Sequence, residues 1–161
     1  TKESIFNIIK HSKLLNINLE NSNILDLFSG VGSFGLECLS RGAASVTFLE
    51  SYKEVLTILK KNIDNLKQQN YSKVIEKDIF AENTLKLLDN KFDIIFIDPP
   101  FKEKKLVDLL SRIIKLKLLK DNGVIIVHRH KKEVDTFPNE FNLIVSKNYG
   151  ISKIIFGNTL T

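Results

Sequence analysis

The sequence lacks methionine and tryptophan, has one cysteine among 161 residues, and contains no long hydrophobic run. A membrane-spanning helix needs about 20 consecutive apolar residues, so we expect no transmembrane span, no signal peptide and no membrane partner. The single cysteine, Cys38, cannot form an internal disulfide, which favours a reducing, cytoplasmic location. Because Cys38 lies inside a predicted helix, we interpret it as a packing residue rather than a nucleophile. The absence of methionine predicts that an N-terminal segment is missing.

Arginine is also scarce, since only three of the 24 basic residues are arginine. The net charge of +5 permits a polyanionic partner such as RNA. A lysine-rich composition can equally reflect an AT-rich genome, so the charge by itself does not decide between these two explanations. The hydrophobic content of 43% and the charged content of 27% are ordinary for a soluble globular protein. We therefore expect residues 1–161 to form a single domain.

Short apolar strands alternate with amphipathic helices along most of the chain. We expect strands at residues 23–28, 45–50, 72–78, 92–98 and 123–129, and helices at 2–15, from the glycine-rich turn to about 41, at 52–69, around 81–88 and at 104–119. Two further strands, within 142–150 and 152–158, flank a tight turn at Gly150. The pattern predicts an α/β fold with a doubly wound, mostly parallel seven-stranded sheet and a C-terminal antiparallel hairpin. This combination is typical of Rossmann-like class I methyltransferases.

The glycines of "DLFSGVGSFG" follow the first predicted strand and begin a helix. Gly30, Gly32 and Gly35 have the G-x-G-x-x-G spacing, which lets the backbone turn sharply and approach a ligand closely. Dinucleotide-binding enzymes use the same spacing, so the pattern alone is not specific. Asp26 lies just before the turn, where a carboxylate is unfavourable for a pyrophosphate but suits an ammonium and a sulfonium. These residues therefore favour S-adenosylmethionine, and we include the neighbouring Phe28 in the predicted cofactor site.

Acidic residues also end the second and third predicted strands. Glu50 lies 20 residues after Gly30, where a carboxylate can bind the two ribose hydroxyls. Asp78 could accept a hydrogen bond from the adenine amino group, with Ile79 or Phe80 against the ring. The alternative for each acid is a helix N-cap exposed to solvent. Together with the glycine turn, the acids predict a cofactor site at the carboxyl edge of the sheet.

The stretch "FDIIFIDPPF" ends a buried strand in an acid, two prolines and an aromatic ring. We expect the Asp98 carboxylate and the Pro99 carbonyl to accept hydrogen bonds from an exocyclic amine, whose lone pair then points at the methyl group. Pro99 and Pro100 make this loop rigid. Phe101 could stack on the target base, which a helical substrate would have to flip out. The alternative is that Asp98 caps the next helix and Phe101 is a core residue.

The whole chain resembles the bacterial 16S rRNA guanine-N2 methyltransferase family (RsmD-like). The resemblance rests on "KESIFNII", "LDLFSGVGSFGLECLSRGA", "FLE", "FDIIFIDPPF" and "NYGISKIIF", with Lys2 where the family usually has arginine. It implies methyl transfer from S-adenosylmethionine to a guanine amine, with small-subunit rRNA or an assembly particle as partner. It assigns Asp26, Gly30, Gly32 and Glu50 to the cofactor, and the loop from Asp98 to Phe101 to the amine. The family usually continues upstream with a basic segment, which we expect to be missing from this chain.

Three other functions remain open. An adenine-N6 methyltransferase acting on DNA or RNA could use the same loop, although no segment is available for a DNA-recognition domain. A glutamine methyltransferase would be expected to have Asn-Pro-Pro-Tyr in this loop. A non-catalytic RNA-binding assembly factor would not need Asp98 or the acidic cofactor residues. We expect a monomer in each case.

The basic residues near the predicted active-site edge form the last group. Lys2, Lys102, Lys104, Lys105, Arg129 and Lys131 are expected to bind RNA phosphates. His128 stands where many family members have glutamate, and could be a ligand or an acid–base group. We interpret His128 and His130 instead as part of a basic or solvated edge. Their spacing does not indicate a metal site.

Overall fold

The computed structural model describes residues 2–81, 83–100 and 105–159. Within these residues one sheet has the strand order β3-β2-β1-β4-β5-β7-β6. The strands are β1 (Asn23–Leu27), β2 (Ser45–Leu49), β3 (Ser72–Ile75), β4 (Phe92–Ile97), β5 (Leu119–His130), β6 (Phe141–Tyr149) and β7 (Ser152–Thr159). The helices are α1 (Lys2–His11), α2 (Ser33–Ser40), α3 (Lys53–Asn65) and α4 (Leu106–Lys115), with short 3₁₀ turns at Gln69–Tyr71 and Leu85–Leu87. The predicted fold class is confirmed.

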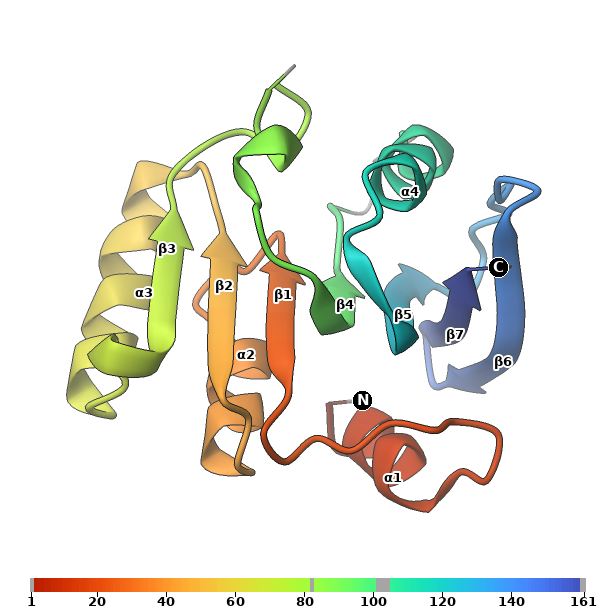
Figure 1. Cartoon of the computed structure of the whole chain (residues 1–161), viewed down its shortest axis with the longest axis horizontal. Coiled ribbons are helices and arrows are strands. Elements are labelled where there is room, and N and C mark those ends of the chain that lie inside the picture. The colour runs from red at the N-terminus through yellow and green to blue at the C-terminus, as the bar shows by residue number, and fades with distance from the viewer. Residues whose placement is uncertain (1, 82, 101–104, 160–161) are drawn as a thin grey trace.

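The five strands from β3 to β5 are parallel, and β7 is antiparallel to both β5 and β6. Figure 1 shows β3, β2 and β1 side by side, with their arrowheads at the same end of the sheet. From β1 the chain adds β2 and β3 on one side, and then crosses over to add β4 and β5 on the other side. The crossover point therefore lies between the neighbouring strands β1 and β4. Doubly wound folds bind ligands at such a crossover point, outside the carboxyl ends of the strands.

Two hydrophobic clusters cover the two faces of the sheet. One cluster joins α1, α2 and α3 to alternate strand residues, including Ile24, Phe48 and Phe96. The other joins α4 and the segment 79–88 to the intervening strand residues, including Leu25 and Ile97. Side chains two residues apart in a strand lie on the same face. Asp26, two residues after Ile24, and Asp98, two residues after Phe96, are therefore on the side of the sheet that α2 covers.

Helices α3 and α4 end four residues before their predicted ends, and the structure gives the reason. The chain leaves α3 at Lys67 (φ 56°) and α4 at Lys117 (φ 54°), both in the left-handed conformation. In each case the next N–H bonds a carbonyl five residues back, from Gln68 to Ile63 and from Leu118 to Ile113. This is the Schellman helix ending, which usually contains glycine. Lysine at this position gives no sequence signal, so the predictions to 69 and 119 were wrong.

Four other features also differ from the predictions. The first helix ends at His11 rather than near 15, and the expected helix around 81–88 is only the 3₁₀ turn Leu85–Leu87. The third strand ends at Ile75, so Asp78 lies in the following loop. The fifth strand begins at Leu119, within the segment that we had predicted as helix. The closing hairpin and its turn at Gly150 (φ 57°) are confirmed.

Close packing of α2 on β2 requires a residue without a side chain at position 35. A Cβ atom there would lie 2.5 Å from a ring carbon of Phe48 and 2.8 Å from a methyl group of Val46. Alanine favours a helix over glycine by about 1 kcal/mol, but overpacking a core costs about 1–3 kcal/mol. The steric cost therefore outweighs the helix propensity.

We expect Gly35→Ala to lower the free energy of unfolding by up to about 2 kcal/mol, measured by urea denaturation. The control is Gly150→Ala, because a Cβ atom there meets no atom within 4 Å and the cost is only that of a positive φ. A Gly35→Ala variant more stable than the wild type would show that α2 can shift away from the sheet.

Candidate active site

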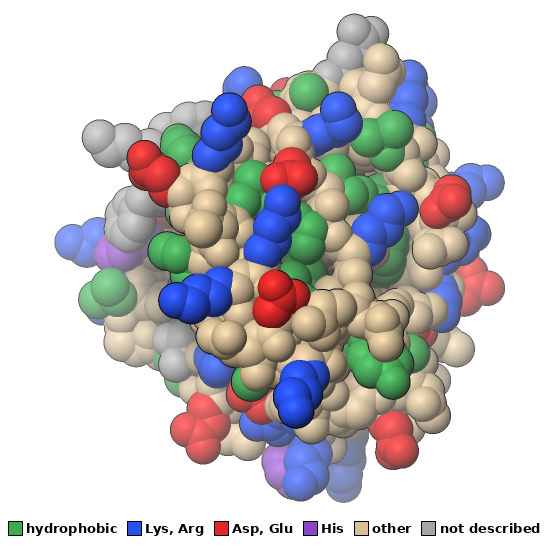
Figure 2. Space-filling view, turned by 90° about the vertical axis from the view of Figure 1, so that its left-hand side faces the viewer, with side chains coloured by type: hydrophobic (Ala, Val, Ile, Leu, Met, Phe, Trp, Pro, Cys, Tyr) green, Lys and Arg blue, Asp and Glu red, His purple; other side chains and the backbone are tan. Residues whose placement is uncertain are grey.

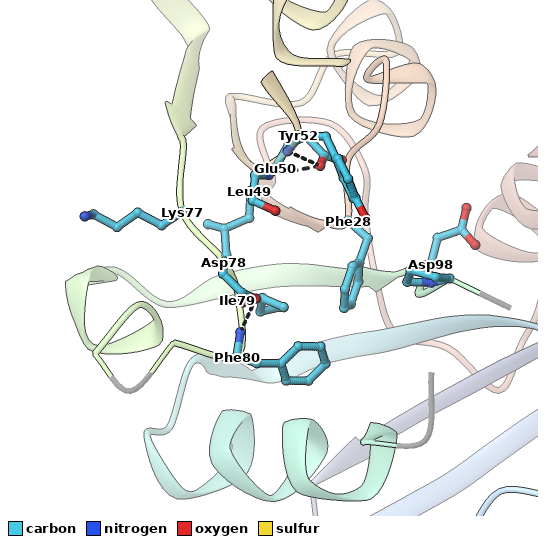
Figure 3. Close-up of a pocket in the computed structure, with 11 residues that line it drawn as sticks. Phe28, Leu49, Glu50, Tyr52, Lys77, Asp78, Ile79, Phe80 and Asp98 are labelled. Atoms are coloured by element: carbon cyan, nitrogen blue, oxygen red, sulfur yellow. Dashed lines mark hydrogen bonds between the residues drawn. The ribbon is translucent and has the colours of Figure 1, made fainter. Parts of the chain in front are cut away.

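Two adjoining hollows open at the carboxyl edge of the sheet and share Phe28 and Asp98. The first is also lined by Leu49, Glu50, Ser51, Tyr52, Lys77, Asp78, Ile79, Phe80 and Pro100. The second is also lined by Lys2, Ile5, Asp26, Ser29, Gly30, Val31, Ser33, Phe34, Phe96 and His128. In Figure 3, Glu50 and Asp78 lie to one side of the Phe28 ring and Asp98 lies to the other. Most of the predicted site residues therefore meet at one edge.

Asp26 is the buried charge of this site. Its residue is 1% exposed, and its Oδ2 atom accepts a hydrogen bond from the Gly35 N–H at 3.1 Å. Burial raises the pKa of Asp26 well above its ordinary value; the bond from Gly35 partly opposes this, and the charges of Asp98 and Glu50 add to the rise. The carboxylate form is thus unfavourable by itself, and a cation in the second hollow would stabilise it.

The turn after β1 has backbone conformations that few residues adopt. Gly30 (φ 56°) and Gly32 (φ 88°) are left-handed, and a Cβ atom at Gly32 would lie 2.5 Å from Leu59. Phe28 is also left-handed, with φ 57°. Such a conformation costs a bulky residue about 1–3 kcal/mol and is found mainly at functional sites. In this protein the strained Phe28 lies at the boundary between the two hollows.

Glu50 connects the glycine turn to the loop after β2. Its Oε1 atom accepts a hydrogen bond from the Gly30 N–H at 2.8 Å. Its Oε2 atom accepts from the N–H groups of Ser51 and Tyr52, at 2.9 and 3.1 Å. A carboxylate can accept about four hydrogen bonds, so one acceptor position is left beyond these three. Tyr52, which the sequence did not identify, lines the same hollow and is 72% exposed.

The far end of the first hollow is apolar with one acid. The Asp78 Oδ1 atom accepts a hydrogen bond from the Phe80 N–H at 2.9 Å, and Ile79 is buried beneath it. The rings of Phe80 and Phe28 have centroids 5.8 Å apart. Lys77 points away from this group in Figure 3. An apolar wall with an acceptor beside it suits a flat ring with an amino group.

Asp98 follows β4 and lies between the two hollows. The side chain is 46% exposed, Pro99 is buried and Pro100 lines the first hollow. Phe101 lies outside the described residues. The parallel register pairs Leu27 with Ile97, so the turn after β1 and the loop after β4 start side by side. The roles predicted for these residues stay predictions, but the structure brings the described ones together.

The sequence left two roles open for His128 and favoured a basic or solvated edge, whereas the structure places His128 at the site. It lines the second hollow, and its Nδ1 atom lies 3.0 Å from Asp98 Oδ1. Its Nε2 atom lies 2.9 Å from Ser152 Oγ. The parallel pairing of Ile97 with Val127 is the feature that places residues 98 and 128 next to each other. A sequence-based model of the strand order would have provided this signal.

The predicted RNA-binding residues divide into three groups. The structure contradicts the prediction for Arg129, whose side chain is 2% exposed and bonds both carboxylate oxygens of Asp135, at 3.0 and 2.9 Å. Lys2 lines the second hollow 3.6 Å from Glu37, Lys105 lies 5.1 Å from the ring centre of Phe80, and Lys131 is exposed. Lys102 and Lys104 lie outside the described residues. Arg129 therefore stabilises the loop after β5.

Two kinds of feature are absent from the described ranges 2–81, 83–100 and 105–159. Histidine, cysteine and acidic side chains there form no group of three or more that could hold a metal ion. None of the helices in these ranges is long and apolar enough to cross a membrane. Cys38 is buried, and burial raises its thiol pKa well above the usual value, which is consistent with a packing role.

The raised pKa of Asp26 predicts a pH-dependent stability. The folded state binds the Asp26 proton more tightly than the unfolded state does, so the free energy of unfolding falls as pH rises from about 4 through the folded pKa. Asp26→Asn removes this loss. We expect urea denaturation to show a larger stability gain for Asp26→Asn at pH 7 than at pH 4. Asp89→Asn, at an exposed position, is the control, and an equal gain at both pH values would contradict the prediction.

The chain is similar to known proteins over most of its length. The model of the family described as "Conserved hypothetical protein 95" matches residues 1–158. The ribosomal RNA small subunit methyltransferase D of Buchnera aphidicola subsp. Baizongia pistaciae is 34% identical, over 95% of this chain and 74% of its own length. The enzyme of the same name from Haemophilus influenzae is 36% identical, over 93% of this chain and 75% of its own length.

Solved structures have the same fold. A conserved hypothetical protein of Streptococcus pyogenes superposes with a TM-score of 0.83 and 25% identity, covering 98% of this chain and 95% of its own. The ribosomal protein L11 methylase of Lactobacillus delbrueckii subsp. bulgaricus shares the fold with a TM-score of 0.73 at 17% identity, covering 97% and 76%. The sheet order, the site at its carboxyl edge and these matches agree, and the chain belongs to the family described as Conserved hypothetical protein 95, as a homologue of the small subunit methyltransferases D.

Proposed function

We propose that this protein transfers a methyl group from S-adenosylmethionine to the exocyclic N2 amine of a guanine in small-subunit rRNA. The observation that carries the proposal is the position of Asp98, which lines both hollows beside the strained turn at Phe28. The two relatives named ribosomal RNA small subunit methyltransferase D support the rRNA substrate. The choice of guanine rests on the resemblance in the Asp98 loop.

The residues of the two hollows fit S-adenosylmethionine. The first hollow combines the apolar side chains of Leu49, Ile79 and Phe80 with the acids Glu50 and Asp78, which suits an adenine ring and a ribose. The second contains the buried Asp26, whose carboxylate would be stabilised by the ammonium and the sulfonium. A pyrophosphate would instead meet a buried negative charge. This difference favours a cationic cofactor over a dinucleotide.

The chemistry requires little more than orientation of the acceptor amine. The Asp98 carboxylate and the Pro99 carbonyl each accept a hydrogen bond from an N–H group of the amine. The lone pair of the nitrogen is then directed at the methyl carbon. Transfer would form a nitrogen–carbon bond and break the sulfur–carbon bond of the cofactor, whose sulfur would keep the bonding electrons. The methylated nitrogen is then cationic and loses a proton to Asp98 or to water. A strong base is therefore not needed before the transfer.

The basic residues near this edge are proposed to bind the phosphates that flank the target base. Lys2 and Lys131 are exposed, and Lys105 lies over Phe80 at the mouth of the first hollow. Figure 2, which shows the side of the molecule formed by α3 and β3, has basic and acidic side chains interspersed. On that face the positive charge is not gathered into one patch, so we assign RNA binding to the carboxyl edge instead.

The central prediction concerns Asp98→Asn. The variant keeps the size of the side chain but presents an N–H group toward the N–H of the amine, so we expect kcat to fall by about 100–1,000-fold. The affinity for S-adenosylmethionine should change by less than about threefold. Methyl transfer to small-subunit rRNA with labelled cofactor measures the rate, and isothermal titration measures the affinity.

The product identifies the function. Mass mapping should locate the label on guanine N2 in the wild-type reaction. Label on adenine N6 would support the alternative enzyme, and an unchanged rate in Asp98→Asn would contradict the mechanism. If the wild type bound rRNA but transferred no methyl group, the result would favour an assembly factor.

The RNA-binding edge is tested by charge reversal. The double variant Lys104→Glu/Lys105→Glu should weaken rRNA binding and reduce the slope of log affinity against log salt by about 1–2, because fewer counterions are released. The control is Lys91→Glu/Lys115→Glu, which makes the same charge change where the chain enters β4 and leaves α4, at the opposite edge of the sheet. Fluorescence anisotropy at several salt concentrations measures both. Equal slopes for the two double variants would contradict the proposal.

A further inference from the structure

The side chains of Asp98, His128 and Ser152 form a continuous hydrogen-bonded chain at the carboxyl edge. His128 Nδ1 lies 3.0 Å from Asp98 Oδ1, and His128 Nε2 lies 2.9 Å from Ser152 Oγ. The His128 side chain is 28% exposed, so it is partly enclosed between β4 and β7. Both ring nitrogens therefore have a partner, which an ordinary solvent-exposed histidine does not require.

The chemistry of the three groups determines which of them donates. An ionised carboxylate only accepts hydrogen bonds, so the His128 Nδ1 atom must carry the proton that it shares with Asp98. In the neutral ring the Nε2 atom is then an acceptor, and the Ser152 hydroxyl donates to it. The Asp98 carboxylate thus selects the Nδ1–H form of His128, and the Ser152 hydroxyl, which can donate or accept, fits that form by donating to Nε2. The histidine in turn holds one of the two Asp98 oxygens.

We propose that His128 is a positioning residue for Asp98, and that Ser152 holds the His128 ring in the orientation that this role requires. The inference rests on the proposed function, because it assigns the two Asp98 oxygens different tasks. Oδ1 is bound by His128, and Oδ2 remains for an N–H of the acceptor amine. Without His128 the carboxylate could rotate and present either oxygen, or turn into solvent.

The sheet explains why Asp98 needs such a partner. Asp26 and Asp98 lie on the same side of the sheet and close enough for their charges to raise the pKa of Asp26. Two like charges repel, which favours rotation of the Asp98 side chain away from Asp26. A hydrogen bond from His128, on the neighbouring strand β5, opposes that displacement. The antiparallel strand β7 supplies Ser152, which gives the C-terminal hairpin a role in the site.

The same three residue types form the catalytic triad of serine hydrolases, but their placement does not support that chemistry. Ser152 begins β7 and is not among the residues that line either hollow, whereas Asp98 lines both. A nucleophilic serine must face the substrate, with the aspartate behind the histidine. In this protein the order is reversed, because the aspartate faces the hollows. The chain of hydrogen bonds therefore orients the carboxylate.

Methyl-transfer kinetics test the role of His128 directly. We expect His128→Ala to lower kcat by about 10–100-fold, with the KM for rRNA and the affinity for S-adenosylmethionine within about twofold of the wild type. His128→Asn keeps a donor near the Nδ1 position and should recover most of the lost kcat. Ser152→Ala should lower kcat by a few-fold. The control is His11→Asn, at the exposed end of α1, which should behave as the wild type.

A merely structural role would give a different result. In that case His128→Ala and His128→Asn would lose stability and kcat together, and His128→Asn would not rescue the rate. Equal kcat values for the wild type and His128→Ala would also overturn the inference. Urea denaturation of each variant separates these outcomes from unfolding.

A spectroscopic measurement is independent of activity. Long-range proton–nitrogen correlation spectra of ¹⁵N-labelled protein report which ring nitrogen of His128 carries the proton. We expect the Nδ1–H form in the wild type, and a shifted or averaged signal in Asp98→Asn and in Ser152→Ala. An Nε2–H form in the wild type would overturn the inference. If the wild type transferred no methyl group but showed the Nδ1–H form, the proposed function would fail while the hydrogen-bond geometry stood.

Discussion

The parallel pairing of β1 with β4 is the constraint on which the site depends. This register places Asp26 opposite Phe96 and Leu27 opposite Ile97, so the two strands end at the same level. The glycine turn therefore starts beside the Asp98 loop, although the two segments are about 70 residues apart in the chain. The pairing of β4 with β5 places Ile97 opposite Val127, so His128 lies at the same level as Asp98. A shift of one residue in either pairing would turn the side chains to the opposite face of the sheet.

Electrostatic repulsion is the cost of this arrangement. Asp26, Glu50 and Asp98 converge on the same edge, and the pKa of Asp26 is raised first by burial and then by the other two charges. Backbone N–H groups of Gly30, Gly35, Ser51 and Tyr52 bind Asp26 and Glu50, so the helix beginnings and the glycine turn offset part of the repulsion. The unbalanced negative charge is what makes the site complementary to a cation.

The hairpin and the helix ends show where sequence patterns were and were not sufficient. Alternation of apolar runs predicted the α/β class, the mixed sheet and the hairpin at Gly150, since these patterns reflect burial on one or both faces. The same patterns predicted α3 and α4 too long, because lysine rather than glycine adopts the left-handed ending at Lys67 and Lys117. Local sequence did not indicate the burial of Arg129, because its partner Asp135 follows in an irregular loop.

By itself the sequence determined the residue types and their spacing: glycines after the first strand, acids after the strands, and the Asp-Pro-Pro-Phe exit from a buried strand. These follow from local backbone chemistry, since turns, strand ends and rigid loops require particular residues. The tertiary structure alone decided which of them meet. It placed His128 against Asp98, enclosed Arg129 with Asp135 and buried Asp26 within reach of two other charges. The physical reason is that hydrogen bonds and charge interactions depend on distances across neighbouring strands, and those distances are set by sheet order and register.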